Sequence, residues 1–349
     1  MVEAAQPPRG TREGGASTDP NLSANLYAAS VLDSAALEVL VPLRSELEAL
    51  PDEALLWAMR YARNGEHLKI RIHLPESEVD AIRSRMLSLT EGFFGRLPPA
   101  DDEARRPSRS ESPPIDGRDF GDEPAPDRSL DFTDYRLTKI SFGGEPYLED
   151  PAYRGLMVRA FDRGCSMFLS ELADQRAVID HPRRQRLMWR AMIQAAYALG
   201  LSPQETAAYA AYHRDWLIRS PLLREGKEED QGQEYIENLE RLASRNAGAV
   251  EVLRESIAVE GPREPVPDTP WGATLLRIAR HVDGRYDDSG IQLDPFAAQP
   301  FFPPLIKVLH GFANLIGLKR LDQAFALHLI VRAAAENLEP FQRIHLTPP

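Results

Sequence analysis

Four basic side chains recur at every second position between residues 67 and 74 and form the strongest candidate for a chemical site. Polar and apolar residues alternate strictly along this segment, which is typical of a strand with one buried face. The polar positions are His67, Lys69, Arg71 and His73. Cations gathered on one strand face predict a site for an anion or for carbonyl oxygens. The alternative is a solvated outer face crossed by glutamate side chains.

The preceding residues 55–61 are predicted to pair with this strand. Asn64-Gly65 suits a two-residue hairpin turn, because both central positions of such a turn need a positive φ. This turn predicts that Arg60 lies directly opposite Lys69. Opposed cations destabilise a sheet unless something neutralises them, which favours a bound anion or carbonyl. The same register predicts a core face that contains Trp57, Met59 and Tyr61.

A second candidate is His310, which lies in a strongly apolar segment with Asn314 one helical turn further on. A histidine among apolar residues is commonly a hydrogen-bonded core residue. The functional interpretation is a general acid or base whose pKa is tuned by burial. Asn314, at position i+4, is expected either to orient the imidazole or to bind substrate.

Three further features are weaker candidates. Ser166 could donate a hydroxyl in a pocket, but no base lies near it in the sequence, which favours a role in helix packing. Cys165 is expected to be a small buried side chain rather than a nucleophile. The arginines at positions 183, 184, 186 and 190 predict a solvated helix face, or a docking surface for an acidic peptide.

Composition narrows the class of protein. The 349 residues carry a formal net charge of -12, which argues against nucleic acid as the main partner. The sequence contains no apolar run of membrane-spanning length and no apolar signal segment at its start, so we expect a cytoplasmic protein that does not contact membrane. One cysteine excludes a disulfide framework and a multi-cysteine metal site. The nucleotide-binding and zinc-protease motifs are missing, so no metal or organic cofactor is predicted.

The chain is predicted to be one α+β domain, residues 23–349, after a flexible tail at 1–22. Residues 98–129 contain seven prolines and nine acidic residues and predict a disordered insertion. An antiparallel sheet is expected around the hairpin at 55–74, with a further strand at 135–142. Helices are expected at 76–90, 153–174, 183–199, 303–316 and 319–337, and two others begin near Ser202-Pro203 and at Trp271.

Four segments, in order, resemble the C-terminal domain family of lantibiotic dehydratases, also described as the thiopeptide-type bacteriocin biosynthesis family. They are WAMRYARNGEHLKIRIHL, ISFGGEPYLEDPAYRGLMVRAFDRGCSMFLSEL, AAYALGLSPQETAAYAAYHRDWL and VLHGFANLIGL. The matches span about residues 55–335. The resemblance implies an α+β elimination-type domain that acts on ribosomally made peptides.

The resemblance also implies where elimination chemistry would sit. Enzymes of this family remove glutamate from glutamylated Ser or Thr with a basic pair, which corresponds to Lys69 and Arg71, and a late histidine, which corresponds to His310. A glutamate and an arginine of the family correspond to Thr138 and Ser141, so both charged groups are missing here. The family's tyrosine before Gly–Gly is Phe142, and the arginine after Asn314 is Leu315.

These departures resemble a related branch, the stand-alone thiopeptide pyridine synthases. Such enzymes join two dehydroalanines of a thiazole-containing precursor by a formal [4+2] aza-cycloaddition, with loss of water and of the leader peptide. The resemblance implies that Lys69 and Arg71 hold amide or thiazole groups, that His310 transfers protons, and that aromatic residues stack on azole rings. The remaining residues expected to contact substrate are Arg60, Tyr61, His67, Ser141, Phe142, Ser166 and Asn314.

Two alternatives stay open. One is a stand-alone glutamate-elimination enzyme, and the other is a catalytically inactive scaffold that binds the precursor. The expected partners are a leader-bearing, dehydrated, azole-containing precursor peptide and other enzymes of the same pathway.

Overall fold

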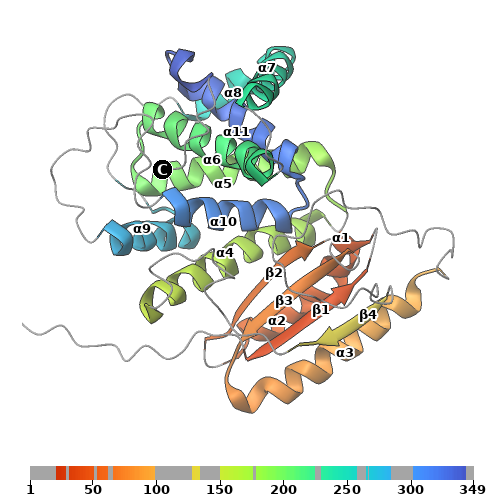
Figure 1. The fold of residues 1–349 in the computed structure, drawn as a ribbon. Helices are drawn as coiled ribbons and strands as arrows, with labels where there is room; N and C mark the ends of the chain where they lie inside the picture. Colours follow the sequence, from red (N-terminus) through yellow and green to blue (C-terminus); the bar gives the residue numbers. More distant parts are fainter. Residues whose placement is uncertain are drawn as a thin grey trace, which may run out of the picture.

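A small antiparallel sheet lies beside a larger helical body (Figure 1). The computed structural model describes residues 21–28, 31–50, 53–61, 66–98, 128–133, 150–175, 178–224, 229–257, 265, 267–283 and 302–342. The predicted strand at 135–142 and the Asn64-Gly65 turn lie outside these residues. The predicted α+β class is confirmed, with helices forming most of the described chain.

The sheet has four strands in the order β2-β3-β1-β4, all antiparallel. They are β1 (Leu22–Tyr27), β2 (Leu55–Tyr61), β3 (His67–His73) and β4 (Ser129–Phe132). The hairpin of β2 and β3 was predicted, whereas β1 and β4 were not. Both unpredicted strands are short and border polar segments of the sequence, so their pattern is weak by itself and tertiary pairing decides their structure.

The register of the hairpin differs from the prediction by one residue. Tyr61 pairs with His67, Met59 with Lys69 and Trp57 with Arg71. A shift of one residue turns every side chain of β2 to the opposite face relative to β3. The prediction that Arg60 faces Lys69 is therefore wrong. Strand β2 is apolar on both sides, with Leu55, Leu56, Trp57 and Ala58 all buried. The order of polar and apolar residues along β2 therefore does not determine its pairing register with β3.

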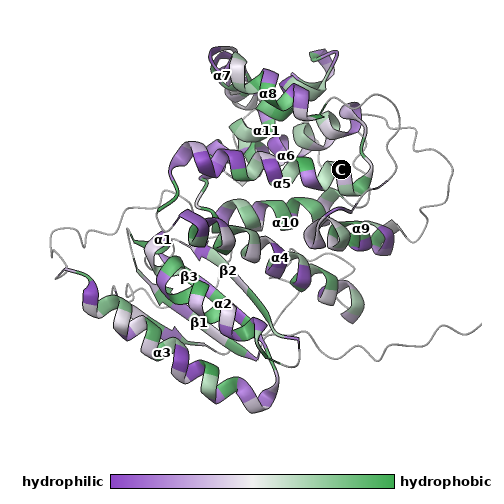
Figure 2. Ribbon diagram, turned by 180° about the vertical axis from the view of Figure 1, so that it is seen from behind, coloured by the Kyte–Doolittle hydropathy of each residue, from purple (hydrophilic) through white to green (hydrophobic). Residues whose placement is uncertain are grey.

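One face of the sheet is apolar and covered by helices. Strands β1, β2 and β3 place Leu22, Ala24, Leu26, Leu56, Ala58, Leu68, Ile70 and Ile72 on this face. A continuous helical segment packs over it, as Figure 2 shows, and consists of α1 (Leu32–Ala35), the π-helical η1 (Ala36–Leu40) and α2 (Val41–Glu48). The short η2 (Glu76–Glu78) leads into α3 (Val79–Arg96), which packs against η1 and α2. Each large aliphatic side chain buried here contributes roughly 1.5–3 kcal/mol to stability.

The opposite face is the polar sheet face, and it holds the basic residues. Strands β1, β2 and β3 place on it Ser23, Asn25, Tyr27, Leu55, Trp57, Met59, Tyr61, His67, Lys69, Arg71 and His73. Cationic side chains of β3 therefore lie between aromatic and apolar side chains of β2 and small or polar side chains of β1.

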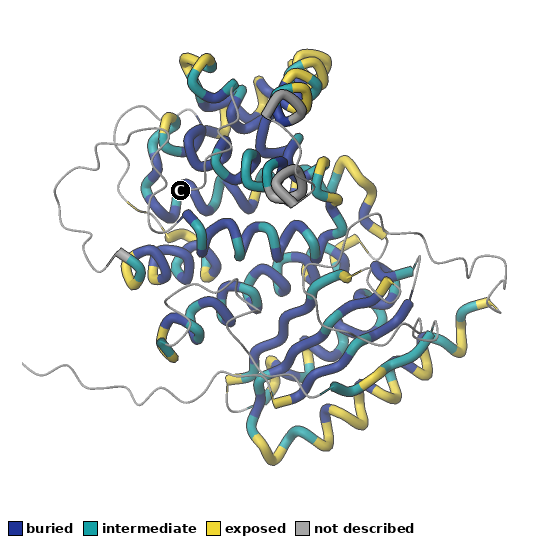
Figure 3. Tube along the Cα trace, viewed as in Figure 1, coloured by how far each residue is buried: buried dark blue, intermediate teal, exposed yellow. Residues whose placement is uncertain are grey.

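The helical body is built from eight long helices of the described chain. They are α4 (Pro151–Gln175), α5 (His181–Leu199), α6 (Pro203–Arg224), α7 (Glu229–Arg245), α8 (Ala247–Ile257), α9 (Pro270–Asp283), α10 (Phe302–Leu315) and α11 (Arg320–Ala334). The 3-10 turn η6 (Glu339–Phe341) follows them. Figure 3 shows that α4 and α10 are mainly buried, whereas α7 has an exposed outer side. No helix of the described ranges is long and apolar enough to cross a membrane.

The helix starts follow local signals that were readable in the sequence. At α6 the Ser202 Oγ accepts from Glu205 N at 3.2 Å, and the Glu205 carboxylate accepts from Ser202 N at 2.6 Å. This is the predicted capping box. Asp180 precedes α5 and its carboxylate accepts from Arg183 N at 2.8 Å, and Gly200, with φ of 70°, follows the last residue of the helix. The hydrogen bonds at the starts of α5 and α6 satisfy backbone N–H groups that a helix leaves unpaired in its first turn.

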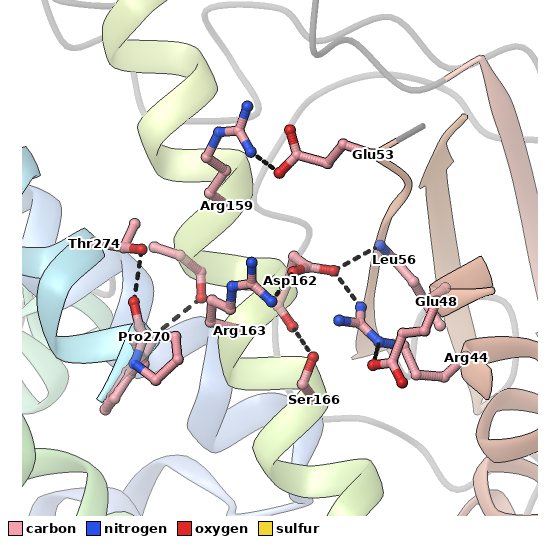
Figure 4. Close-up of polar contacts among 12 residues, drawn as sticks. Arg44, Glu48, Glu53, Leu56, Arg159, Asp162, Arg163, Ser166, Pro270 and Thr274 are labelled. Carbon is pink, nitrogen blue, oxygen red and sulfur yellow. Dashed lines mark hydrogen bonds and ion pairs between the residues drawn. The ribbon is translucent and has the colours of Figure 1, made fainter. Parts of the chain in front are cut away.

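Two buried carboxylates join the sheet to the helical body. Asp162 of α4 accepts from Leu56 N of β2 at 2.9 Å and forms an ion pair with Arg44 of α2 (Figure 4). Asp33 of α1 forms ion pairs with both Arg60 of β2 and Arg184 of α5. Since a buried charge is tolerated only when it is paired and hydrogen-bonded, these contacts fix how the layers meet.

The end of α10 is the third junction. Arg60 Nε donates to Leu315 O at 2.6 Å, and Arg184 donates to Ile316 O. The turn after α10 contains Gly317, whose φ of 77° favours glycine. The pair of arginines bound to Asp33 thus holds the carbonyl end of the helix that carries His310.

Candidate functional site

His310 lies on α10 in a half-buried position, at the centre of a hydrogen-bonded cluster. Its Nδ1 is 2.8 Å from Gln323 Oε1 of α11, and its Nε2 is 3.1 Å from Asn314 Nδ2. Gln323 Nε2 donates to Asn314 Oδ1 at 3.0 Å, which closes the triangle. The expected proximity of His310 and Asn314 is present as this hydrogen bond. We call these three residues the His310 cluster.

The electrostatic surroundings keep the imidazole of His310 uncharged at neutral pH. Burial lowers its pKa from 6.5 to about 4, and Arg320 and Lys307 add to this, although the hydrogen bond to Gln323 acts in the opposite direction. A neutral imidazole can accept a proton at its unprotonated nitrogen. The ring therefore has an unprotonated nitrogen available at neutral pH, and its lowered pKa makes that nitrogen a weaker base than a free imidazole.

Aromatic and cationic side chains surround the His310 cluster. Trp216 of α6 meets the ring edge-on, with centroids 5.2 Å apart, and the Arg320 guanidinium lies 5.9 Å from the centre of the Trp216 ring. His213, also on α6, is completely buried, and burial lowers its pKa well below 6.5. Its Nδ1 is 3.3 Å from Tyr209 Oη. The cluster thus combines a neutral base with aromatic surfaces and a nearby positive charge.

The polar sheet face holds the other predicted catalytic residues. Lys69 Nζ lies 3.8 Å from the centre of the Tyr61 ring, a cation–π arrangement. Arg71 is buried and donates from Nη1 to Ile70 O at 2.8 Å. His67 is buried between two tyrosines, with ring centroids 4.6 Å from Tyr27 and 5.9 Å from Tyr61. The structure therefore places Lys69, Arg71, His67 and Tyr61 on one face. The first three were predicted to share a face. Tyr61 was predicted on the opposite, core face, and that prediction is wrong because the register is shifted.

Two other predicted substrate contacts take structural roles in the described chain. Arg60 points to the opposite sheet face and binds Asp33 and Leu315 O, because the register is shifted. Ser166 Oγ donates to Asp162 O at 3.0 Å, a bond within α4 that Figure 4 displays. Arg60 is therefore removed from the cationic face, and the Ser166 hydroxyl is used inside its own helix.

Ser141 and Phe142, which were predicted to contact substrate, lie outside the described residues. Cys165 is completely buried, and burial raises the pKa of its thiol to about 12. This agrees with the expectation that it is not a nucleophile. Arg183 and Arg184, predicted on a solvated or peptide-docking face, form ion pairs with Glu171 and Asp33 respectively.

The helix that carries His310, α10, packs against β2 of the sheet through the next residue, Gly311. A Cβ atom built on Gly311, next to His310, would lie 3.8 Å from Met59 Cε and 2.7 Å from Phe161 Cε1. Met59 is the cross-strand partner of Lys69 and shares its face. Because Gly311 lacks a side chain, α10 can approach β2 and α4 closely. The hydrogen bonds of His310 extend toward α11, whereas Lys69 and Arg71 lie on β3.

Sequence reasoning missed several residues that shape this site. Gln323, Trp216 and His213 were not singled out, and neither were Asp33 and Asp162. Trp216 and His213 stand in a segment already quoted for the family resemblance, so their three-residue spacing on one helix was a usable signal. The roles of Gln323 and the two aspartates depend on packing between distant elements, which a single sequence does not display.

Comparison with solved structures shows a shared fold. The chain is similar to the solved structure of the pyridine synthase TbtD from thiomuracin biosynthesis, with a TM-score of 0.57 and 16% identity over 90% of this chain and 97% of that one. The predicted family resemblance is therefore confirmed at the level of the fold.

Two further solved structures are similar. The tRNA-dependent lantibiotic dehydratase MibB from Microbispora sp. 107891 aligns with a TM-score of 0.44 and 14% identity, over 95% of this chain and 29% of that chain. TsrL aligns with a TM-score of 0.43 and 16% identity, over 89% and 93% of the two chains. No protein-family model matches the sequence, and a comparison with curated proteins finds no match.

Proposed function

We propose that the protein is a peptide-modifying enzyme, and specifically a pyridine synthase of the thiopeptide type. The observation that carries this proposal is the fold shared with the pyridine synthase TbtD along nearly the whole of both chains. The reaction joins two dehydroalanines of one precursor. One dehydroalanine with the neighbouring amide, as its imidic acid, forms the azadiene, and the second dehydroalanine is the dienophile.

The first demand of this reaction is orientation, because two distant side chains of a flexible peptide must meet. Positioning alone can supply several kcal/mol of the barrier. The polar sheet face suits this task, since Lys69 and Arg71 can hold amide oxygens or azole nitrogens beside Tyr61. Aromatic side chains stack well on azole rings.

The second demand is proton transfer. Forming the imidic acid moves a proton from the amide nitrogen to its oxygen. Loss of water from the cycloadduct and departure of the leader as a carboxamide each remove a ring proton and protonate a leaving group. The neutral imidazole of His310 can take such a proton and return it to the departing group. Nearby cations at Arg320 and Lys307 favour a rapid return of the proton.

The sequence departures favour this reaction over glutamate elimination. Elimination of glutamate needs a base for the α-proton and cations for the leaving carboxylate. The family's glutamate and arginine at these steps correspond to Thr138 and Ser141, which carry no charge. The cycloaddition needs no carboxylate leaving group to be held.

Mass spectrometry of parallel incubations tests the proposal. One substrate is a leader-bearing, thiazole-containing peptide with two dehydroalanines, and the other is a glutamylated precursor. We expect loss of water and release of an amidated leader from the first substrate and no change in the second. Loss of glutamate from the second would overturn the proposal in favour of an eliminase. Binding of both peptides without any mass change would overturn it in favour of a scaffold.

Matched variants connect the result to the residues. Arg71→Gln should lower pyridine formation at least tenfold, whereas Arg254→Gln, on the exposed side of α8 and paired with Glu251, should not. Equal rates of pyridine formation for the two variants would show that the polar sheet face takes no part in the reaction.

A further inference from the structure

The carbonyl of Leu318 is a fixed reference point beside the His310 cluster. In the turn after α10, Leu318 N donates to Ala313 O at 3.0 Å, which closes the helix end. Gln323 Nε2 lies 2.8 Å from Leu318 O. A backbone carbonyl can only accept a hydrogen bond, so the amide group facing it must be the NH2 end of the glutamine.

This contact determines the orientation of the whole Gln323 amide. The side chain is completely buried, so the amide cannot exchange its contacts with solvent. Its second N–H points to Asn314 Oδ1 at 3.0 Å, and its oxygen then faces His310 Nδ1 at 2.8 Å. The usual ambiguity between the nitrogen and oxygen of a glutamine amide is resolved here by the Leu318 carbonyl.

The orientation of the Gln323 amide also decides which nitrogen of the His310 imidazole carries the hydrogen. Gln323 Oε1 is an acceptor, so the hydrogen of the neutral ring must sit on Nδ1 of His310. Since the Asn314 oxygen already accepts from Gln323, its NH2 group faces His310 Nε2 at 3.1 Å and donates to it. One backbone carbonyl thus sets every hydrogen bond of the cluster.

We infer that Gln323 is a positioning residue that holds His310 as the Nδ1–H tautomer and leaves Nε2 as its only basic nitrogen. Asn314 covers Nε2 in the absence of substrate, and a substrate N–H must replace the Asn314 amide to reach it. The use of this tautomer in catalysis rests on the proposed function, but the tautomer itself does not.

The charged groups around the ring agree with a neutral form. Arg320 faces it from α11 and Lys307 from α10, and both oppose a second proton on the imidazole. His213 faces it from α6 and interacts with it electrostatically. A negative partner at Nδ1 would instead favour the doubly protonated ring, whereas an uncharged glutamine fixes the tautomer and leaves the ring neutral.

Nitrogen NMR of the full chain, labelled with 15N-histidine, tests this inference without any substrate. His310→Gln identifies the signals of His310 by their disappearance. In the wild type at pH 7 we expect a protonated Nδ1 and an unprotonated Nε2. Asn314→Leu should keep this pattern, because Gln323 still accepts from Nδ1. Gln323→Met, of similar size, should abolish it and let the Nε2–H form appear.

Gln194→Met is the control, because this half-buried glutamine of α5 has an oxygen without a hydrogen-bond partner among the described residues. It should leave the His310 signals unchanged. A wild-type ring protonated at Nε2 would overturn the inference, even if Gln323→Met failed to fold. An unchanged tautomer in folded Gln323→Met would overturn it too. If pyridine formation is observed, Gln323→Met should lower kcat more than it raises KM.

Discussion

His310 and His328 are both neutral histidines on packed helices, yet their partners differ in kind. His310 is half-buried and is held by two uncharged amides. His328 is 1% exposed and lies between two ions: its Nδ1 is 3.0 Å from Arg214 Nη1, and its Nε2 is 3.0 Å from Glu240 Oε2. Because arginine only donates and a carboxylate accepts, His328 must be the Nε2–H tautomer.

On the proposed function, this difference separates a structural histidine from a reactive one. Arg214 of α6 also donates to Phe341 O at 2.6 Å, so the His328 network connects α6, α7, α11 and the final 3-10 turn. Both ring nitrogens of His328 contact charged groups whose removal would leave buried charges unpaired. At His310 the Nε2 partner is the half-buried, uncharged amide of Asn314. A lowered pKa alone does not distinguish the two.

The largest expected effect is on the His328 network. Arg214→Met should lower the free energy of unfolding by roughly 3–5 kcal/mol, because it leaves buried partners unpaired. Arg254→Met on the surface should change it by less than about 1 kcal/mol. Urea unfolding followed by circular dichroism measures both. Similar losses for the two variants would show that the buried network does not stabilise the fold.

Acid should destabilise the protein, with His328 as one source. Burial, with Arg214 and Arg332, lowers its pKa from 6.5 to about 3. Between these values the unfolded chain binds one more proton than the folded chain, so stability falls as pH falls from about 6.5 to about 3. The slope is on the order of 1.4 kcal/mol per pH unit for each such group.

The variant His328→Gln tests whether His328 causes part of this loss of stability at low pH, since glutamine can replace both hydrogen bonds without titrating. In this pH window, the slope of the unfolding free energy against pH should fall by the equivalent of one bound proton. His310 and His213 still contribute to the slope that remains. An unchanged slope in the variant would mean that His328 is already protonated in the folded state.

A smaller effect tests the corrected register. Arg60→Met should lower the unfolding free energy by about 2–4 kcal/mol, because it leaves one side of the buried Asp33 carboxylate and Leu315 O unpaired. If Arg60 instead lay on the cationic face, its removal would relieve repulsion and stabilise the protein. Thermal unfolding of the variant separates the two signs.

The smallest effect is expected at Lys69. Lys69→Met should leave unfolding within about 1 kcal/mol of the wild type but raise KM for the precursor about tenfold, as loss of one charged contact predicts. Steady-state kinetics followed by mass spectrometry gives both parameters. A lower kcat at unchanged KM would instead give Lys69 a role in the transition state.

Sequence alone predicted the elements with strong local signals. The hairpin alternation, the capping box at Ser202 and Glu205 and the glycine that ends α5 all reflect neighbouring residues, and each is present. The family resemblance added the class of fold. His310 and Asn314 were placed together correctly, because an i, i+4 pair meets on any helix.

What sequence did not predict depends on contacts between distant segments. β2 is apolar on both sides, so only packing against α1, α4 and α10 decides that Arg60 turns toward Asp33. Strand β1 is short, and its pairing with Ile70 and Ile72 determines its structure. Gln323 becomes important only because the turn at Gly317 brings Leu318 O to its amide.

The central claim is that His310 acts in chemistry and His328 in stability. Parallel measurement of His310→Gln and His328→Gln, for pyridine formation and for thermal unfolding at pH 7, tests it directly. We expect His310→Gln to lower turnover at least about 100-fold, as loss of a general base does, with nearly unchanged unfolding. His328→Gln should keep most of the turnover. Full turnover in folded His310→Gln would contradict the account.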